Sequence, residues 1–349
     1  MAVTAFTELQ FFWQKRSVHS DFRAGVSLHS HTMYSEENLN VVPRWIIGAV
    51  SVSHAVGRGV SPDLRNAFWT PPLNPRQAYR LEEKQIHTQF QLPALVSLTD
   101  HDNVRAGSRL RVLDRFHLAP ISTEWTIPFG PTFFHLGVHN IPPENAGAII
   151  EQLNSFTADP EHSALPALLD MLNFHPNLLL VLNHPLWDEK GIGQSAHQEA
   201  LRCLLQSQGL RLHALELNGL RSWQENDRVL KLAQEVNLPV VAGGDRHGLE
   251  PNAILNLSRS LTLAEFVEEI RYRRFSHVVF MPQYRQPRKL RILRMIVDIL
   301  RDYKDLEDRR SWTDRVFGRD PVTGAAISFA SLSARHAAAE IREYLVRDR

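Results

Sequence analysis

Ionisable side chains stand at the ends of several short apolar runs in this chain. The first pair is His29 and His31, at the end of the run that begins at Gly25. Residues two apart in a strand point to the same side, so both imidazoles can reach one metal ion. Histidine is the commonest metal ligand among side chains, and this pair is therefore a candidate metal site.

Later apolar runs carry further candidate ligands. They end in Asp100, His101 and Asp102, in Glu124, in Asn183 and His184, in Asn218, and in Asp245, Arg246 and His247, while His135 lies inside one run. Taken singly, each residue is also compatible with a buried, hydrogen-bonded structural role. Six histidines and several carboxylates together would be costly in an apolar environment unless they converge on cations. The pattern therefore predicts a metal centre.

The runs that carry these residues have the length and the Val, Leu and Ile content of buried strands. Between them lie helical patterns at residues 76–90, 145–155, 164–173, 198–208, 224–237 and 263–273. The alternation predicts an α/β fold with a largely parallel sheet. Such folds place their active sites at the carboxyl ends of the strands, where the candidate ligands stand.

Composition narrows the class of protein. The 349 residues are 43% hydrophobic and 22% charged, which excludes a disordered chain and a collagen. A single cysteine, Cys203, excludes an intrachain disulfide. A net charge of +1 gives no support for bulk nucleic-acid binding. Without a membrane-length apolar run or a signal-peptide pattern, we expect a cytoplasmic protein with no membrane partner.

Two segments interrupt the alternation. Residues 41–75 form a long excursion rich in proline and arginine, which predicts either a lid or a surface insertion that packs on the fold. After Pro287, an apolar spacing predicts an amphipathic helix with Leu293, Ile296, Val297 and Leu300 on its inner face. We expect one domain at residues 1–285 and a helical C-terminal extension at 286–349.

In family terms, the motifs resemble those of the PHP (polymerase and histidinol phosphatase) superfamily of metal-dependent phosphoesterases. The resemblance rests on His29-Ser-His31-Thr32, Thr99-Asp-His-Asp102 with Gly107, Ser122-Thr-Glu124, His135-Leu-Gly137, Asn183-His-Pro185 and Gly244-Asp-Arg-His247. It implies a distorted (β/α)7 TIM-like barrel that holds two or three divalent ions of Mn, Fe or Zn. We expect no DNA polymerase, because too few residues follow His247 to form polymerase modules.

The resemblance also implies a ligand set. His29, His31, Glu124 and Asp245 would hold one ion, Glu124, His135 and His184 a second, and His101, His247 and Glu36 a third. The family usually has an aspartate followed by glycine where this chain has Glu36 and Glu37. The third site is therefore expected to be reshaped, weaker or empty.

The implied reaction is hydrolysis of a phosphomonoester by a hydroxide that bridges the metals. We expect His101 or His247 to protonate the leaving oxygen, and Asp100, Asp102 and Asn183 to orient the imidazoles. Arginine and lysine bind phosphate oxygens. Each such side chain is also compatible with a surface or structural ion pair. The candidates for gripping phosphate are Arg105, Lys190, Arg221 and Arg246.

Several functions share these motifs. We expect the substrate to be a nucleotide, a nucleoside bisphosphate or a short RNA end, and no obligate protein partner. The alternatives are a histidinol-phosphatase-like enzyme, an amidohydrolase-like metal hydrolase and a non-catalytic PHP module. Phosphate release and metal content separate these alternatives.

Overall fold

The computed structural model describes residues 4–14, 21–38, 67–306, 309, 311–319 and 323–331. The predicted lid at 41–75 falls mostly outside these residues, and only 67–75 can be compared with the structure. Within the described ranges, every helix is too short or too polar to cross a membrane.

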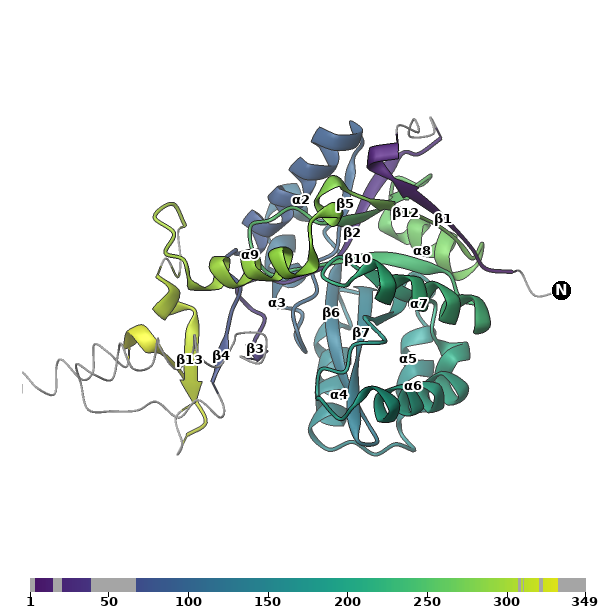
Figure 1. Ribbon diagram of the computed structural model, residues 1–349. Helices are drawn as coiled ribbons and strands as arrows, with labels where there is room; N and C mark the ends of the chain where they lie inside the picture. The colour runs from purple at the N-terminus through teal and green to yellow at the C-terminus, as the bar shows by residue number, and fades with distance from the viewer. Residues whose placement is uncertain are drawn as a thin grey trace, which may run out of the picture.

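A ten-stranded mixed sheet forms the centre of the molecule (Figure 1). Its order is β1-β12-β11-β2-β10-β9-β8-β7-β6, and β5 pairs with β2 beside this path. The strands are β1 (Phe6–Phe11), β2 (Ala24–Ser30), β5 (Ala94–Val96), β6 (Ile121–Phe129), β7 (Thr132–Ile141), β8 (Leu179–Asn183), β9 (Ala214–Asn218), β10 (Val240–Arg246), β11 (Ile254–Ser258) and β12 (Phe275–Phe280). The predicted α/β class is confirmed.

The predicted closed barrel is not shown. The sheet is not closed, because β5 and β6 do not pair with each other. The contact between them is a single parallel bridge from His101, which follows β5, to Glu124 of β6. Pairing is also less parallel than predicted, because β11 runs antiparallel to both β2 and β12, and β7 runs antiparallel to both β6 and β8. A hairpin causes this reversal: Gly130 has a φ of 57° and turns the chain directly from β6 into β7.

Each helix that the sequence predicted is present, and α3 (Arg105–Arg111) is a further helix that was not predicted. The others are α2 (Pro75–Phe90), α4 (Ala146–Ala158), α5 (Leu165–Asn173), α6 (Gln194–Gln208), α7 (Trp223–Glu235), α8 (Leu263–Arg271) and α9 (Arg288–Leu300). Short 3-10 turns are η1 (Phe12–Gln14), η4 (Asp114–Phe116), η5 (Gly209–Arg211), η6 (Pro282–Arg285) and η7 (Trp312–Asp314). Capping boxes at Asn74–Gln77 and Thr262–Glu265 begin α2 and α8.

The core lies on both faces of this sheet. One face of β8 and β9 packs Leu180, Leu182 and Leu215 beneath α4, α5, α6 and α7. The other face packs Val26 and Val241 with Phe266 of α8 and its neighbours. Each fully buried side chain of this size contributes about 1.5–3 kcal/mol, so the strand ends that carry the candidate ligands are held on a rigid base.

A second, four-stranded sheet joins distant parts of the chain. Its order is β14-β13-β4-β3, with bounds Ala326–Ser328, Val316–Arg319, Phe68–Trp69 and Glu37–Asn38. Met295 and Ile299 of α9 pack in one cluster with Trp69 and Val316 of this sheet. The described part of the C-terminal extension therefore contains strands as well as a helix, and it packs beside the segment that follows β2.

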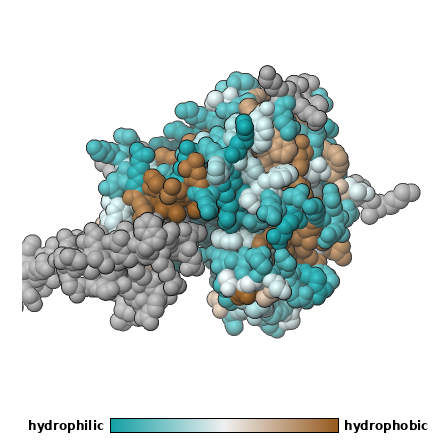
Figure 2. Space-filling view, in the orientation of Figure 1, coloured by the Kyte–Doolittle hydropathy of each residue, from teal (hydrophilic) through white to brown (hydrophobic). Residues whose placement is uncertain are grey.

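The predicted inner face of α9 is partly wrong. Leu293 and Val297 are each 51% exposed, and Figure 2 shows an apolar patch over α9. Met295 and Ile299 are buried in their place. The spacing identified the helix correctly but not its orientation, because apolar residues occupy both sides of it.

Candidate metal centre

Three strands end at the candidate site in the left-handed backbone conformation. His29 at the end of β2 has a φ of 63°, His184 after β8 has 28°, and Asp245 in β10 has 52°. Residues other than glycine rarely adopt this backbone conformation, and those that do are concentrated at functional sites. The pairing of β10 with β2 also shifts register between Gly243 and Arg246. These departures from regular strand geometry bring the side chains together.

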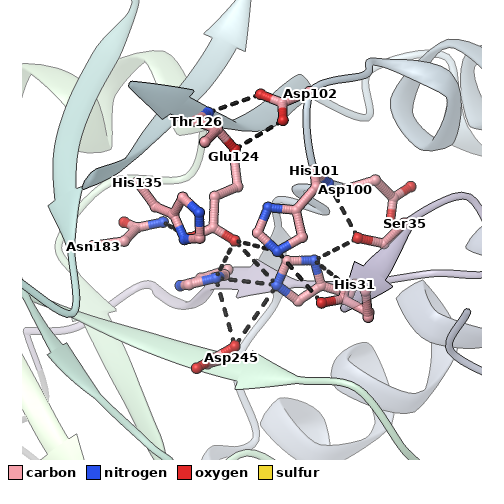
Figure 3. A network of polar contacts seen from close by, with 12 residues as sticks. His31, Ser35, Asp100, His101, Asp102, Glu124, Thr126, His135, Asn183 and Asp245 are labelled. Carbon is pink, nitrogen blue, oxygen red and sulfur yellow. Dashed lines mark hydrogen bonds and ion pairs between the residues drawn. The ribbon is translucent and has the colours of Figure 1, made fainter. Parts of the chain in front are cut away.

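Glu124 of β6 lies at the centre of the cluster (Figure 3). Its Oε2 lies 2.9 Å from His29 Nε2 and 3.3 Å from His31 Nε2. Its Oε1 lies 3.1 Å from His184 Nε2 and 3.4 Å from His135 Nδ1. The carboxylate therefore faces the two predicted ligand groups with one oxygen each, which is the arrangement of a bridging ligand.

Asp245 completes the first predicted group. Its Oδ1 lies 3.7 Å from Nε2 of both His29 and His31, whose Nε2 atoms are 3.1 Å apart. All the side chains of this group are 5% exposed or less. The first and second predicted ligand groups are thus assembled from β2, β6, β7, β8 and β10.

The third group is assembled with a different carboxylate from the one predicted. Glu36 is half exposed and pairs with Arg319. Its neighbour Glu37 turns inward, and its Oε2 lies 3.4 Å from His101 Nε2 and 3.3 Å from His247 Nε2. Glu37 belongs to β3, whose pairing with Trp69 and Phe68 of β4 sets its direction. The prediction of Glu36 is therefore corrected to Glu37.

The charges of the cluster depend on one another. Burial opposes ionisation of Glu124, but His29, His101 and His135 outweigh it and lower the pKa of Glu124 well below its usual range. Glu37 behaves likewise, with its pKa lowered by His247, His101 and His31 against the effect of burial. These carboxylates are therefore ionised and available as ligands.

The imidazoles divide into two kinds. Burial lowers the pKa of His29 and of His101, but neighbouring carboxylates outweigh it and raise both. Burial dominates at His135, whose pKa lies well below its usual value. His135 is thus neutral with a lone pair available, as a metal ligand must be.

The donor set fits divalent cations. Four overlapping groups each bring three ligand atoms within 4.8 Å of one another. The groups are His29, Glu124 and His184; His29, His31 and Asp245; His31, Glu37 and His247; and His31, His101 and Glu124. Glu37 Oε1 and His135 Nδ1 are buried without a hydrogen-bond partner among the described residues. Mixed imidazole and carboxylate donors suit Zn, Fe and Mn.

Glu216 of β9 is a buried residue in contact with the cluster that the sequence prediction missed. Its Oε1 lies 2.5 Å from His29 Nδ1, so it orients the imidazole from behind. Its Oε2 accepts hydrogen bonds from the backbone N–H of His184 and from Nδ2 of Asn218, at 2.8 and 2.9 Å. A carboxylate between two leucines of a buried strand was the available signal, since such a group needs buried partners.

Predicted supporting residues take two different roles. Asn183 donates from Nδ2 to Glu124 Oε1 at 2.9 Å, as a ligand-orienting residue would. Asp100 and Asp102 instead hold the backbone and hydroxyl of Thr32 and Thr126, with distances of 2.6–2.8 Å. Figure 3 shows both aspartates away from the Glu124 centre. Both aspartates therefore fix the loops that carry His31 and His101, and among the described residues neither makes the predicted hydrogen bond to an imidazole.

The metal cluster opens into a cavity of about 240 Å³. Of the basic residues predicted to grip phosphate, only Arg221 lines it. Arg246 is buried in an ion pair with Glu82 at 2.9 Å. Arg105 lies over the ring of Tyr34, and Lys190 is exposed outside the lining. Besides Glu37, the lining contains two charged residues that the sequence did not single out, Glu189 and Arg288.

Comparison with known proteins gives few matches. No protein-family model matches the chain, and no curated protein matches it. Among solved structures, a protein assigned as a metal-dependent phosphoesterase from Bifidobacterium adolescentis is 15% identical, covering 71% of this chain and 95% of that one, with a TM-score of 0.37. An amidohydrolase from Chromobacterium violaceum, solved with sulfate and no metal, is 14% identical, covering 77% and 96%, with a TM-score of 0.39. Membership of the PHP superfamily stays a prediction from the motifs.

Proposed function

We propose that this protein is a metal-dependent phosphoesterase that hydrolyses a phosphomonoester. The observation that carries the proposal is the buried cluster around Glu124, which opens into a cavity that also contains the Arg221 guanidinium. Ligands for two or three divalent ions and a phosphate-binding side chain are thereby present in one enclosed space.

The charge balance of the site favours an anionic substrate. Glu37, Glu124 and Asp245 supply three negative charges near six imidazoles. Two or three divalent ions bring four to six positive charges, so the filled site is positive overall. Arg221 adds to this field, and a phosphate dianion would neutralise it.

Divalent ions held by this cluster would polarise the phosphoryl oxygens and lower the pKa of water in the site. The protein's own residues supply position and proton transfer. Glu216 and Asn183 hydrogen-bond to the ligands His29 and Glu124, and in this proposal Arg221 donates to the phosphoryl oxygens. His101 and His247 are 17% and 10% exposed, the most open imidazoles of the cluster, and are the candidates to protonate the leaving oxygen.

The motifs also support a PHP-type barrel as the finer description of the fold. The bridge from His101 to Glu124 and the hydrogen bond from Asp102 N to Glu124 O, 2.9 Å, bring the end of β5 beside β6. This contact supports the proposal of a barrel that is distorted at that seam.

The test is phosphate release by the purified protein, with added Mn²⁺ and after chelation. The panel holds 5′- and 3′-nucleotides, nucleoside bisphosphates, short 5′-phosphorylated RNA and histidinol phosphate. We expect metal-dependent release from at least one class, and a loss of at least about 100-fold in Glu124→Gln. Glu36→Gln is the matched control and should retain activity. Bound metal without release from any member would overturn the proposal.

A further inference from the structure

A second cavity, of about 50 Å³, lies between the end of β10 and helix α9. Asp245 and His247 line it, together with Arg291, Met295 and Asp298 of α9. Met295 also lines the larger cavity at the metal cluster, so α9 contributes a wall to both. A buried water needs about 10–15 Å³, so the second cavity has room for roughly four groups of that size. It is therefore large enough for a small polyatomic ion.

Four polar atoms without partners belong to residues that line this second cavity. They are Arg246 Nη2, Asn252 Oδ1, Gln283 Oε1 and Arg291 Nε. Each is buried and has no hydrogen-bond partner among the described residues. Arg246 pairs with Glu82 through its Nε, so its Nη2 is the atom left over. Because buried polar atoms are normally paired, the cavity is suited to a ligand that satisfies these four.

Arg291 is a buried cation without a carboxylate partner. It donates to the backbone carbonyls of Tyr284, Gln286 and Arg221 at 2.6, 3.0 and 2.8 Å, and it makes no ion pair in the part of the chain that the structure describes. Burial lowers its pKa, and the charge of Arg288 acts in the same direction. An anion beside a buried guanidinium compensates its charge. The ligand of the second cavity is therefore expected to be an anion.

The lining also contains acceptors, which a fully deprotonated anion leaves unsatisfied. Asn252 donates its Nδ2 to Ser27 Oγ at 2.8 Å and to Glu82 Oε2 at 3.1 Å. These bonds assign its Oδ1 as the unpaired atom, and Oδ1 can only accept. Gln283 Oε1 is a second unpaired acceptor. The ligand must therefore carry O–H or N–H hydrogens as well as a negative charge.

Three carboxylates at the second cavity limit how much negative charge the ligand can carry. Asp245 faces the imidazoles of the metal cluster, Asp298 accepts the Leu249 N–H at 2.8 Å, and Glu250 lies 3.4 Å from Arg294. Their charges disfavour an ion with several negative charges. The lining as a whole thus suits a singly charged anion that has hydroxyl groups.

We propose that the second cavity binds inorganic phosphate in a protonated form, at a site separate from the metal centre. The phosphate oxygens accept hydrogen bonds from the two guanidinium groups, and the O–H groups donate to the two amide oxygens. Dihydrogen phosphate combines one negative charge with acceptor oxygens and O–H donors. Sulfate has the same shape but no O–H at neutral pH, so the buried acceptors discriminate against it. This inference goes beyond the proposed function, because the site does not depend on what the metal cluster hydrolyses.

Isothermal titration calorimetry of the Mn²⁺-loaded protein at neutral pH tests the site. Excess phenylphosphonate occupies the metal centre during the titration, because it cannot be hydrolysed and is too large for a cavity of about 50 Å³. It also separates a free ion from a phosphate that is part of a larger molecule. We expect the wild type to bind one further equivalent of phosphate or of arsenate, and to bind sulfate at least about tenfold more weakly.

Two variants address the cation and an acceptor of the site separately. Arg291→Met should weaken the binding of phosphate at least about tenfold. Arg285→Met is its matched control, because Arg285 is exposed and outside the lining, and it should bind phosphate as the wild type does. Gln283→Leu is the milder second variant, since its side-chain oxygen has no partner to lose. It should reduce the preference for phosphate over sulfate.

The outcomes decide between a phosphate site and a cavity that holds only water. The proposal is overturned if the wild type binds no further phosphate, if phosphate and sulfate bind equally, or if Arg291→Met binds phosphate as tightly as the wild type. Should Arg291→Met fail to fold, Gln283→Leu decides, and an unchanged preference for phosphate over sulfate overturns the proposal. Failure of the protein to release phosphate from esters overturns the proposed function alone.

Discussion

Adjacent glutamates at positions 36 and 37 have opposite environments, and this difference can be tested by metal content. Glu37 faces His101 and His247, whereas Glu36 pairs with Arg319 at the surface. We predict that Glu37→Gln loses about one equivalent of bound metal and that Glu36→Gln loses none. Elemental analysis after dialysis against Mn²⁺ or Zn²⁺ checks this. Equal metal content in both variants would contradict the assignment of Glu37.

Most of the individual residues of the candidate metal centre could be predicted from the sequence. The histidines and Glu124 could be identified because each follows or interrupts a strand of apolar residues. The choice between Glu36 and Glu37 could not be made, because it depends on how a short strand pairs with β4. Glu216 was missed because one carboxylate inside a strand has no spacing signal. Its role appears only when β9 lies beside β10.

Arg246 is expected to act on stability and not on substrate binding. Its guanidinium meets Glu82, which also accepts hydrogen bonds from Ser27, Ser30 and Asn252, all buried. Arg246→Leu leaves that carboxylate without its cation, at a cost of about 3–5 kcal/mol. Arg105→Leu, at an exposed position, should cost no more than about 0.5 kcal/mol. Urea denaturation in the presence of a chelator measures the free energy of unfolding of both variants without a contribution from bound metal.

His213 should make the fold sensitive to acid. Its Nδ1 accepts the backbone N–H of Leu180 at 2.9 Å and its Nε2 lies 2.7 Å from Asn173 Oδ1, a pattern that requires the neutral ring. Burial, together with the charges of Arg271 and Arg274, lowers its pKa to about 3.

The unfolded chain therefore binds more protons at this site, and stability falls as pH drops from about 6.5 towards about 3. We predict a steeper loss for the wild type than for His213→Gln. Measuring the free energy of unfolding at intervals between pH 7 and 4 compares them. Parallel curves would show that His213 does not contribute.

At the scale of elements, β10 approaches β9 so closely that only glycine fits at position 243. A Cβ there would lie 1.5 Å from Glu216 Oε1. Gly243→Ala must displace Glu216, which orients His29, and should cost about 1–3 kcal/mol as well as bound metal. Gly147→Ala in α4 meets nothing within 4 Å and is the control, expected to be neutral or stabilising. Thermal melts and metal content would be measured together.

The helices were more predictable than the strand arrangement. α2 and α8 have capping boxes, and their apolar spacing repeats over whole turns. The antiparallel course of β6, β7 and β8 was not predicted, because buried strands look alike in sequence whichever way they run. Nor does spacing reveal the left-handed residues that end β2 and β8, since these conformations are imposed by the site around them.

For the whole molecule, stability and metal occupancy should be linked. The cluster gathers buried carboxylates and imidazoles from five strands, and a cation that binds only the folded chain stabilises it. We predict that chelation lowers the Tm and that Mn²⁺ restores it. When the ion is at 100 times its Kd, it should add about 2.7 kcal/mol to the free energy of unfolding. Scanning calorimetry checks this. In Glu124→Gln the same ion should shift the Tm by much less.

The four-stranded sheet has a consequence for how the protein is made. Its strand β4, which pairs with β3, also pairs with β13 (Val316–Arg319), so the early and late parts of the chain meet only after synthesis has reached β13. The ligands end at His247, whereas Met295 and Val316 come later. At about 5–20 residues per second, a ribosome needs roughly 3–14 s to cover that interval. During much of this interval, all the candidate ligands have been synthesised while the wall that α9 supplies to the cavity has not.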